Sequence, residues 1–252
     1  MSDVATLPTT RDEDWRYADP AALRELTVRT LDDWHEITLA AGEAQVQTYV
    51  LDDAKPGVTR VRLTLGEGAR AEIYAIALAN DYTRLEVEVT LARGAHFEFG
   101  GVTIGGGEVT REFVTRVRHA EPEATSNQTI RAVHWNRATG NFLGRIEVVK
   151  DAQKTDAAQN FRAILLEKGA SANTKPELEI FADDVKCAHG AAIGALDDSA
   201  GYYMAARGIP PEVARRLQVQ AFVADAFVAM EDETLAENML AKVLDRLEDA
   251  AI

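Results

Sequence analysis

Apolar and polar residues alternate along five short segments in the middle of the chain, and this two-residue period limits the fold more than any other feature. Alternation puts apolar side chains on one face of an extended strand and polar side chains on the other. Glycine or asparagine follows most of the segments, with no room for long helices between them. The segments are residues 61–65, 85–89, 114–117, 146–148 and 178–180. The region from residue 38 to residue 194 is therefore predicted to be a β core.

A faint internal repeat suggests how these strands are arranged. The run Leu-Thr-Leu-Gly-Glu-Gly-Ala ending at Ala69 resembles Val-Thr-Leu-Ala-Arg-Gly-Ala ending at Ala95, and a shorter echo ends at Ala170. The separations are 26 and 75 residues, or about one and three turns of a common period. A period of this size favours a stacked β-helix or solenoid. A β-sandwich remains an alternative at this point.

Helical patterns lie on both sides of the β core. Asp19 is a suitable N-cap and Pro20 a suitable first residue for a short helix over residues 21–26, after a polar start that we expect to be loose up to Asp14. The chain therefore divides into an N-terminal helical region (residues 1–37), the β core (residues 38–194) and a C-terminal helical subdomain (residues 195–252).

Three helices are predicted in the C-terminal subdomain. The first follows Asp197 and stops near Gly208, and the second opens at Pro211. The third is predicted to begin with a capping box, in which Thr234 is the N-cap and the side chain of Glu237 accepts a hydrogen bond from its backbone amide.

Composition excludes several classes of partner. The 252 residues include 27 Lys and Arg against 41 Asp and Glu, so the net charge is −14. An acidic surface repels phosphate backbones and anionic lipids, so nucleic acid and membranes are not expected partners. No apolar run approaches the roughly 18 residues of a membrane span, and the first residues do not resemble a secretory signal. A cytoplasmic protein is expected.

The only cysteine, Cys187, lies two residues before His189, one of five histidines. If residues 185–193 form a strand, both side chains lie on one face and could bind the same metal. The alternative is a purely structural role, with a small buried cysteine beside a histidine whose ring nitrogens are hydrogen-bonded. A structural zinc site lacks its other ligands, and a complete iron–sulfur site within one chain would need more thiolates than one.

The second C-terminal helix is apolar on more than one face. Leu217 belongs to a stripe with Val213 and Ala221, while Phe222 and Val223 lie off it. Such a helix either packs on two sides within its own protein or offers one side to a partner. The candidate partner-binding residues are Leu217, Phe222, Val223, Phe227 and Met230.

The residues from 144 to 210 resemble the SufB/SufD family of the SUF iron–sulfur cluster assembly system, and its SufD branch in particular. The resemblance is carried by Gly-Arg-Ile from Gly144, by Asp-Ala-Gln-Lys-Thr-Asp-Ala from Asp151 with Gln159, by Thr-Lys-Pro-Glu-Leu-Glu-Ile from Thr174, by Asp-Asp-Val-Lys-Cys-Ala-His from Asp183, and by Arg-Gly-Ile from Arg207. Trp15-Arg16-Tyr17 is similar to the family's N-terminal pattern. Gly190 stands where SufB-like chains tend to have Glu, and their additional cysteines are missing.

This resemblance implies a right-handed parallel β-helix with helical ends. It implies a scaffold rather than an enzyme, which pairs with a SufB-like subunit and holds a SufC-type ABC ATPase through its C-terminal helices. A homodimer is expected when the SufB-like subunit is absent. His189, with Cys187 beside it, becomes a candidate ligand of a transient iron–sulfur cluster shared with that subunit, and a reduced flavin could serve the complex. The alternative, allowed by the solenoid pattern alone, is a β-helix enzyme that acts on carbohydrate.

Overall fold

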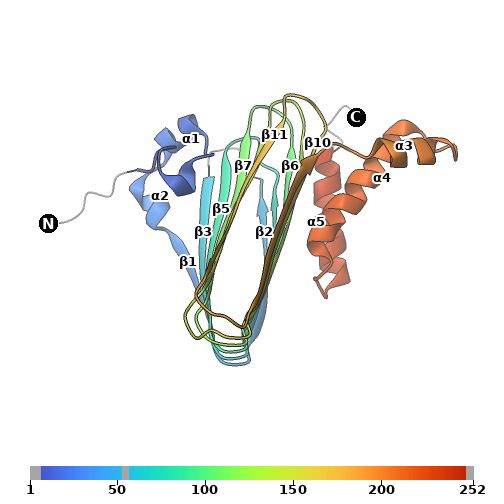
Figure 1. Cartoon of the computed structure of the whole chain (residues 1–252). Coiled ribbons are helices and arrows are strands. Elements are labelled where there is room, and N and C mark those ends of the chain that lie inside the picture. The colour runs from blue at the N-terminus through green and yellow to red at the C-terminus, as the bar shows by residue number, and fades with distance from the viewer. Residues whose placement is uncertain (1–6, 53–56, 248–252) are drawn as a thin grey trace.

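The computed structural model describes residues 7–52 and 57–247, and within these ranges the chain winds into a parallel β-helix (Figure 1). Two six-stranded sheets face each other, one in the order β1-β3-β5-β7-β9-β11 (sheet A) and one in the order β12-β10-β8-β6-β4-β2 (sheet B). Every strand pair is parallel. The strands are β1 (Trp34–Leu39), β2 (Ala44–Leu51), β3 (Gly57–Leu65), β4 (Arg70–Ala77), β5 (Thr83–Leu91), β6 (His96–Gly105), β7 (Thr110–His119), β8 (Thr125–His134), β9 (Thr139–Val148), β10 (Asp156–Leu165), β11 (Ser171–Ile180) and β12 (Lys186–Gly194). The β-helix predicted from the sequence is confirmed.

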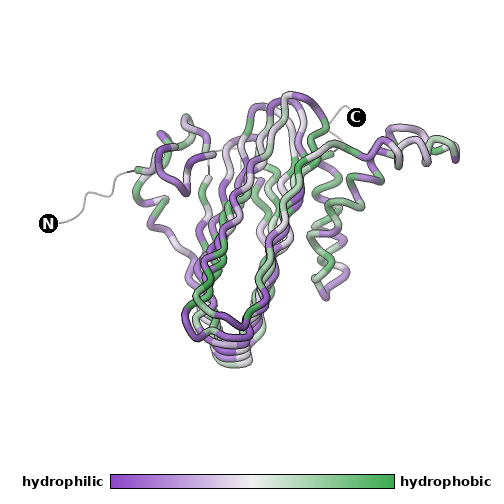
Figure 2. The backbone as a smooth tube through the Cα atoms, viewed as in Figure 1, coloured by the Kyte–Doolittle hydropathy of each residue, from purple (hydrophilic) through white to green (hydrophobic). Residues whose placement is uncertain are grey.

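The interior between the sheets is the main apolar core. Leu63 and Val87 of sheet A meet Ile73 and Phe99 of sheet B there, all fully or almost fully buried. Phe99 and Phe113 lie edge to face with ring centroids 5.6 Å apart. Figure 2 shows apolar residues recurring along both sheets and along the C-terminal helices. Burial of alternate residues in a shared core is why the two-residue period appears in the sequence.

The coils lengthen along the solenoid. Residues that pair across neighbouring strands are 26 apart in the first coils, as for Glu36 and Arg62, and 30 to 32 apart in the last, as for Asp156 and Lys186 or Asn141 and Asn173. One corner keeps its geometry throughout, because a residue with positive φ recurs there in each coil. These residues are Gly42, Gly68, Gly94, Glu123 and Lys154. The backbone amide of each bonds to the following coil at this corner.

The internal repeat is confirmed in part. Gly68 and Gly94 occupy equivalent positions at the corner that leads from sheet A to sheet B. Gly169 lies at the opposite corner, between β10 and β11. The separation of 75 residues is therefore not three whole coils. The short motif describes any tight corner after an apolar strand, and it does not distinguish the two kinds of corner.

The N-terminal region is bound to the outer face of sheet A. It contains a short 3-10 helix (η1, Glu13–Trp15), α1 (Pro20–Glu25) and α2 (Val28–Asp32), and Asp19 caps α1 as predicted. The guanidinium of Arg84 lies 3.7 Å from the centre of the Trp15 ring. Glu13 and Asp14 form ion pairs with Lys175 and Arg116, both at 2.8 Å or less. The expectation of a loose chain up to Asp14 is therefore wrong for Glu13 and Asp14, and it lies outside the described residues for 1–6.

The C-terminal helices α3 (Asp198–Ala205), α4 (Pro211–Ala224) and α5 (Glu233–Leu247) follow β12, with a 3-10 turn, η2 (Asp225–Phe227), after α4. Helices α4 and α5 lie along the outer face of sheet B, whereas α3 projects away (Figure 1). The buried residues of α4, η2 and α5 share an apolar cluster with the outward-facing residues of sheet B. The cluster includes Tyr74, Ile76, Val102, Ile104, Val133, Trp135, Val219, Val223, Phe227, Met239 and Val243.

Two sequence-based details are corrected at these ends. The N-terminal cap of α5 is Asp232, whose carboxylate accepts a hydrogen bond from the amide of Leu235 at 2.9 Å, and not Thr234. Strand β1 begins at Trp34, so the predicted boundary at residue 38 falls inside a strand. No helix in the described ranges is long and apolar enough to span a membrane.

Gly100 offers a direct test of the packing of η2 on sheet B. A Cβ atom at Gly100 would overlap the carbonyl oxygen of Ala226 in η2. Gly100→Ala should therefore lower the free energy of unfolding by about 1–3 kcal/mol. Gly201→Ala is the matched control, because its Cβ in α3 would meet nothing closer than 3.8 Å and alanine favours a helix. Chemical denaturation of both variants measures the difference, and equal effects would contradict this packing.

Candidate functional site

Strand β12 places Cys187 and His189 on the face that points into the β-helix. In the register of sheet B, Cys187 pairs with Ala157, and His189 pairs with Gln159. Ala157 and Gln159 are both buried in the interior. Because side chains alternate along a strand, Cys187 and His189 share that direction. The predicted strand and the shared face are both present in the structure.

The end of the β-helix formed by β11 and β12 (the open end) has no further coil above it. Strand β12 pairs only with β10, and β11 only with β9, so each leaves one backbone edge without a strand partner among the described residues. His189 is exposed there, and Cys187 is half-buried against an apolar cluster that includes Ile146 and Val148. Both side chains are thus within reach of a molecule that covers the open end.

Apolar residues at the open end are exposed although two of them point toward the interior. Ile180 and Ile193 point inward, as their partners Val148 and Ala163 do, but they are 39% and 46% exposed because no coil covers them. Phe181, just after β11, is 65% exposed. Exposed apolar side chains beside unpaired strand edges are typical of an interface with another protein.

The interior becomes polar toward the open end. The hydroxyl of Thr115 donates to Oε1 of Gln128 at 2.5 Å, and Ser126 bonds to Nε2 of His119 at 3.0 Å. Desolvation lowers the pKa of His119 to about 4, so its ring is neutral near pH 7. One coil further out, Nε2 of Gln159 donates to the carbonyl oxygen of Glu177 at 3.3 Å. The second and third coils carry the apolar residues Ile73 and Phe99 at the equivalent interior position.

Burial and a neighbouring charge keep the Cys187 thiol protonated. Desolvation raises the pKa of Cys187, and the carboxylate of Asp156 raises it further. A thiolate, not a thiol, is the metal ligand and the nucleophile. Cys187 therefore lacks the electropositive surroundings of a catalytic cysteine, and a positive charge at the open end would be needed to favour its thiolate form.

The described residues contain no cluster of three or more His, Cys, Asp or Glu side chains that could hold a metal ion. The open end offers two ligand types, a thiol and an imidazole, on one strand. A complete iron–sulfur site takes about four ligands. The arrangement fits a shared site at an interface and does not fit one held by this chain alone.

The predicted partner-binding residues differ in their burial. Val223, Phe227 and Met230 are at least 93% buried between α4, η2 and sheet B, so their prediction as a partner surface is wrong. Phe222 is half-buried, with the guanidinium of Arg131 5.7 Å from its ring centre. Leu217 alone is exposed. The helix has two apolar faces because one of them covers sheet B.

The exposed apolar side chains of α3 and α4 form a separate surface. Tyr202, Tyr203, Val213 and Leu217 are 77%, 59%, 42% and 44% exposed. A shallow cleft of about 330 Å³ lies between these two helices, and Tyr202 is among its lining residues. We refer to these four residues as the α3–α4 surface.

A salt bridge that the sequence did not suggest anchors α4 to sheet B. Arg131 of β8 is buried, and its Nε donates to the carboxylate of Asp225 at 3.0 Å. Its partner is 94 residues away in the sequence. No local pattern announces such a pair, because the contact depends on how the helices fold back onto the sheet.

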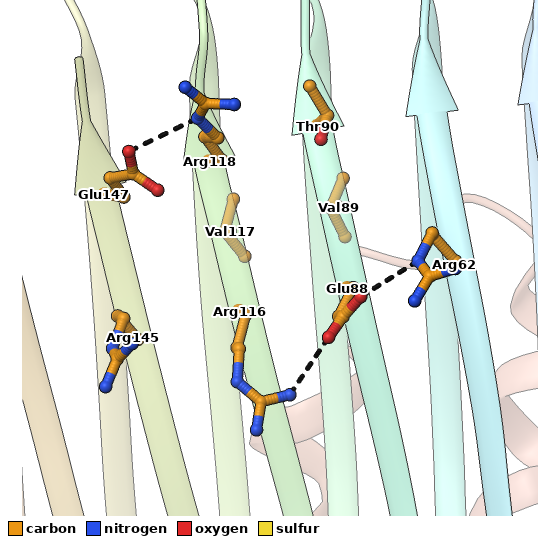
Figure 3. Close-up of a pocket in the computed structure, with 9 residues that line it drawn as sticks. All are labelled: Arg62, Glu88, Val89, Thr90, Arg116, Val117, Arg118, Arg145 and Glu147. Carbon is orange, nitrogen blue, oxygen red and sulfur yellow. Dashed lines mark hydrogen bonds and ion pairs between the residues drawn. The ribbon is translucent and has the colours of Figure 1, made fainter. Parts of the chain in front are cut away.

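The outer face of sheet A carries a shallow pocket of about 220 Å³ lined by charged residues (Figure 3). Its two carboxylates are both paired with arginines. Glu88 lies between Arg62 and Arg116, at 2.9 and 3.2 Å, and Glu147 lies 3.3 Å from Arg118. Sugar cleavage needs one carboxyl group as an acid and another as a base or nucleophile. Both carboxylates of this pocket are engaged by guanidinium groups and neither is free to act on a sugar, so this pocket does not favour the carbohydrate-enzyme alternative.

The reactivity of Cys187 tests its surroundings. Because the pKa of this thiol is raised, its reaction with a disulfide reagent should be slower than that of a free cysteine at pH 7.5, with a rate that climbs at higher pH. Asp156→Asn should lower the pKa and speed the reaction. The chain has one cysteine, so the signal is unambiguous. A rate at pH 7.5 equal to that of free cysteine would contradict the assignment.

Comparison with known proteins places these features in a family. Residues 30–222 match the family model described as "SUF system FeS cluster assembly, SufBD core domain", which covers more than half of the chain. The match includes the whole β-helix together with α3 and most of α4.

Individual relatives agree with the family model. The chain is 36% identical over 137 residues to the iron–sulfur cluster assembly protein SufD of Escherichia coli, which covers 54% of this chain and 32% of that protein. It is 28% identical over 214 residues to SufD of Bacillus subtilis, covering 82% and 48%. A SufBD family protein of Synechocystis is 29% identical over 189 residues, covering 73% and 42%. The matches span between a third and a half of these relatives.

The family match extends over the open end, with its single cysteine and its histidine on β12, and over most of α4, one of the two helices that cover sheet B. The chain therefore belongs to the SufB/SufD family of SUF iron–sulfur cluster assembly proteins, as a SufD-like member.

Proposed function

We propose that the chain is a non-enzymatic scaffold subunit for iron–sulfur cluster assembly, which pairs with a SufB-like subunit and docks a SufC-type ABC ATPase. The observation that carries the proposal is the open end, where Cys187 and His189 lie on the inward face of the last strand and no further described coil covers them. In a SufD-like chain, an exposed pair of ligands at an unpaired sheet edge favours assembly on a second subunit over catalysis within this one.

The SufB-like subunit would cover the open end. Strands β11 and β12 each offer a row of backbone donors and acceptors, and Ile180, Phe181 and Ile193 supply apolar area beside them. Unpaired strand edges can pair with a strand of another chain, and burial of the apolar side chains is favourable. A second copy of this chain could occupy the same place when no SufB-like subunit is present.

The cluster is cargo, and its site would lie at that junction. His189 would offer a ring nitrogen and Cys187 a thiolate, and the partner would supply the remaining ligands. The raised pKa of Cys187 keeps it protonated until a metal ion or a base arrives. Any electrons for assembly, for example from a reduced flavin, would come from elsewhere in the complex.

The ABC ATPase would dock on the α3–α4 surface. Helix α4 joins this surface to the β-helix, because Val219 and Val223 on its other side are fully buried and Asp225 is held by Arg131. A movement of the ATPase would therefore be passed to sheet B as a rigid displacement. Deleting these helices would expose the apolar outer face of sheet B, so point substitutions are the cleaner probes.

The role of His189 can be tested by measuring how much iron–sulfur cluster the assembled complex holds. His189→Ala should reduce cluster loading of the assembled complex at least tenfold while leaving subunit association intact, because the imidazole is a ligand and not a packing group. Iron and sulfide content after anaerobic reconstitution measures loading, and size-exclusion chromatography measures assembly. Lys186→Ala, an exposed neighbour on the other face of β12, is the control. Normal loading of the His189→Ala complex would remove the ligand assignment.

The second prediction separates the two partners. Tyr202→Ser with Leu217→Ser should lose the ATPase in an anaerobic pull-down and keep the SufB-like subunit. Phe181→Asp with Ile193→Asp should do the reverse, because each pair removes apolar area from one surface only. Each double variant is the control for the other. If both variants retain both partners, or the wild-type chain binds neither, the proposed assembly is wrong.

A further inference from the structure

Gln159 lies directly beneath the candidate ligand His189. In sheet B, the column Ile73, Phe99, Gln128, Gln159 and His189 runs in register from one coil to the next. The column begins at Gln47 in the first coil, is apolar at Ile73 and Phe99, and is polar in the last three coils. Gln128 and Gln159 are 0% and 2% exposed, so their amides are interior groups and not surface groups that happen to align.

The orientation of the Gln159 amide is determined by its neighbours. Its Nε2 lies 3.3 Å from the carbonyl oxygen of Glu177, across the interior. A carbonyl oxygen can only accept a hydrogen bond, so the nitrogen must face Glu177 and the oxygen must face away. Oε1 of Gln159 is buried and has no hydrogen-bond partner among the described atoms.

Gly144 makes room for this oxygen. A Cβ atom at Gly144 of β9 would overlap Oε1 of Gln159. The interior therefore has a space fitted to an amide oxygen, and that oxygen is left without a donor. The Gln128 amide, one coil further in, differs in this respect, because its Oε1 accepts from Thr115 at 2.5 Å.

The next side chain outward in the column is that of His189. A neutral imidazole has one N–H donor and one nitrogen acceptor. A histidine that ligates a metal commonly donates its other ring N–H to an oxygen, which fixes the tautomer and the orientation of the ring. A buried acceptor without a donor, in register with a histidine without a cover, is the complementary arrangement.

We propose that Gln159 is a positioning residue for His189, because its Oε1 accepts a hydrogen bond from the ring N–H. This bond holds the imidazole in one tautomer and turns the other ring nitrogen out of the open end. The metal-directed consequence rests on the proposed function, but the hydrogen bond itself does not.

The tautomer of His189 is the direct readout. Long-range ¹H–¹⁵N spectra of the full chain at pH 8 report the tautomer of each of its five histidines, and the signal lost in His189→Ala identifies the residue. Wild-type His189 should show one dominant tautomer. Gln159→Met, which keeps the volume and removes the acceptor, should shift the population toward that of free imidazole.

Gln128→Met is the matched control, since it removes the same group from the same column one coil away, and His189 should keep its wild-type tautomer. An unchanged tautomer in folded Gln159→Met overturns the proposal. If Gln159→Met does not fold, Gly144→Ala displaces the same oxygen and must give the same shift, and its failure to do so also overturns the proposal.

A zinc titration followed at the His189 signal separates this proposal from the cargo assignment. If both hold, Zn²⁺ affinity should fall about 10- to 100-fold in Gln159→Met. A tautomer shift without any zinc binding at His189 would support the positioning role of Gln159 and count against the metal role of His189.

Discussion

Each coil of the β-helix depends on the next coil for two things, the backbone partners of its strands and the cover over its interior side chains. Parallel pairing supplies both at once, because strands in register stack inward-facing residues above one another. Within the described part of the chain, the last coil has neither on its outer side. Strands β11 and β12 therefore each lack one strand partner, and their inward side chains lack a cover. The candidate ligands Cys187 and His189 lie there.

The sequence predicted one sheet far better than the other. All five alternating segments became strands of sheet A, namely β3, β5, β7, β9 and β11. The outer face of sheet A is charged, so the two-residue period survives in its sequence. Strands β4 and β6 of sheet B are buried on both faces, since α4 and α5 cover the outside, and their residues read as almost continuous apolar runs. The two-residue period alone cannot identify a strand that is buried on both faces of its sheet.

The same effect explains what was right and wrong about the site. Local spacing was enough to place Cys187 and His189 on one face of a strand. It could not show which apolar face of α4 would pack on sheet B, because that depends on Tyr74, Val102 and Trp135, which lie far away in the chain. Gln159 and Gly144 were visible only as residues that match a family. Their contact across the interior is a property of the folded coil.

The gradual lengthening of the coils has a consequence for symmetry. A rod with a sheet edge at each end could in principle stack head to tail and grow without limit, since such heterologous contacts do not close. Here a coil with a 26-residue repeat would have to pack on one with a repeat of 30 to 32 residues, and the corners would not superpose. The open ends of two molecules have the same coil length and therefore match each other. A contact between them leaves neither open end free for a third molecule. The taper thus favours a closed pair over a filament.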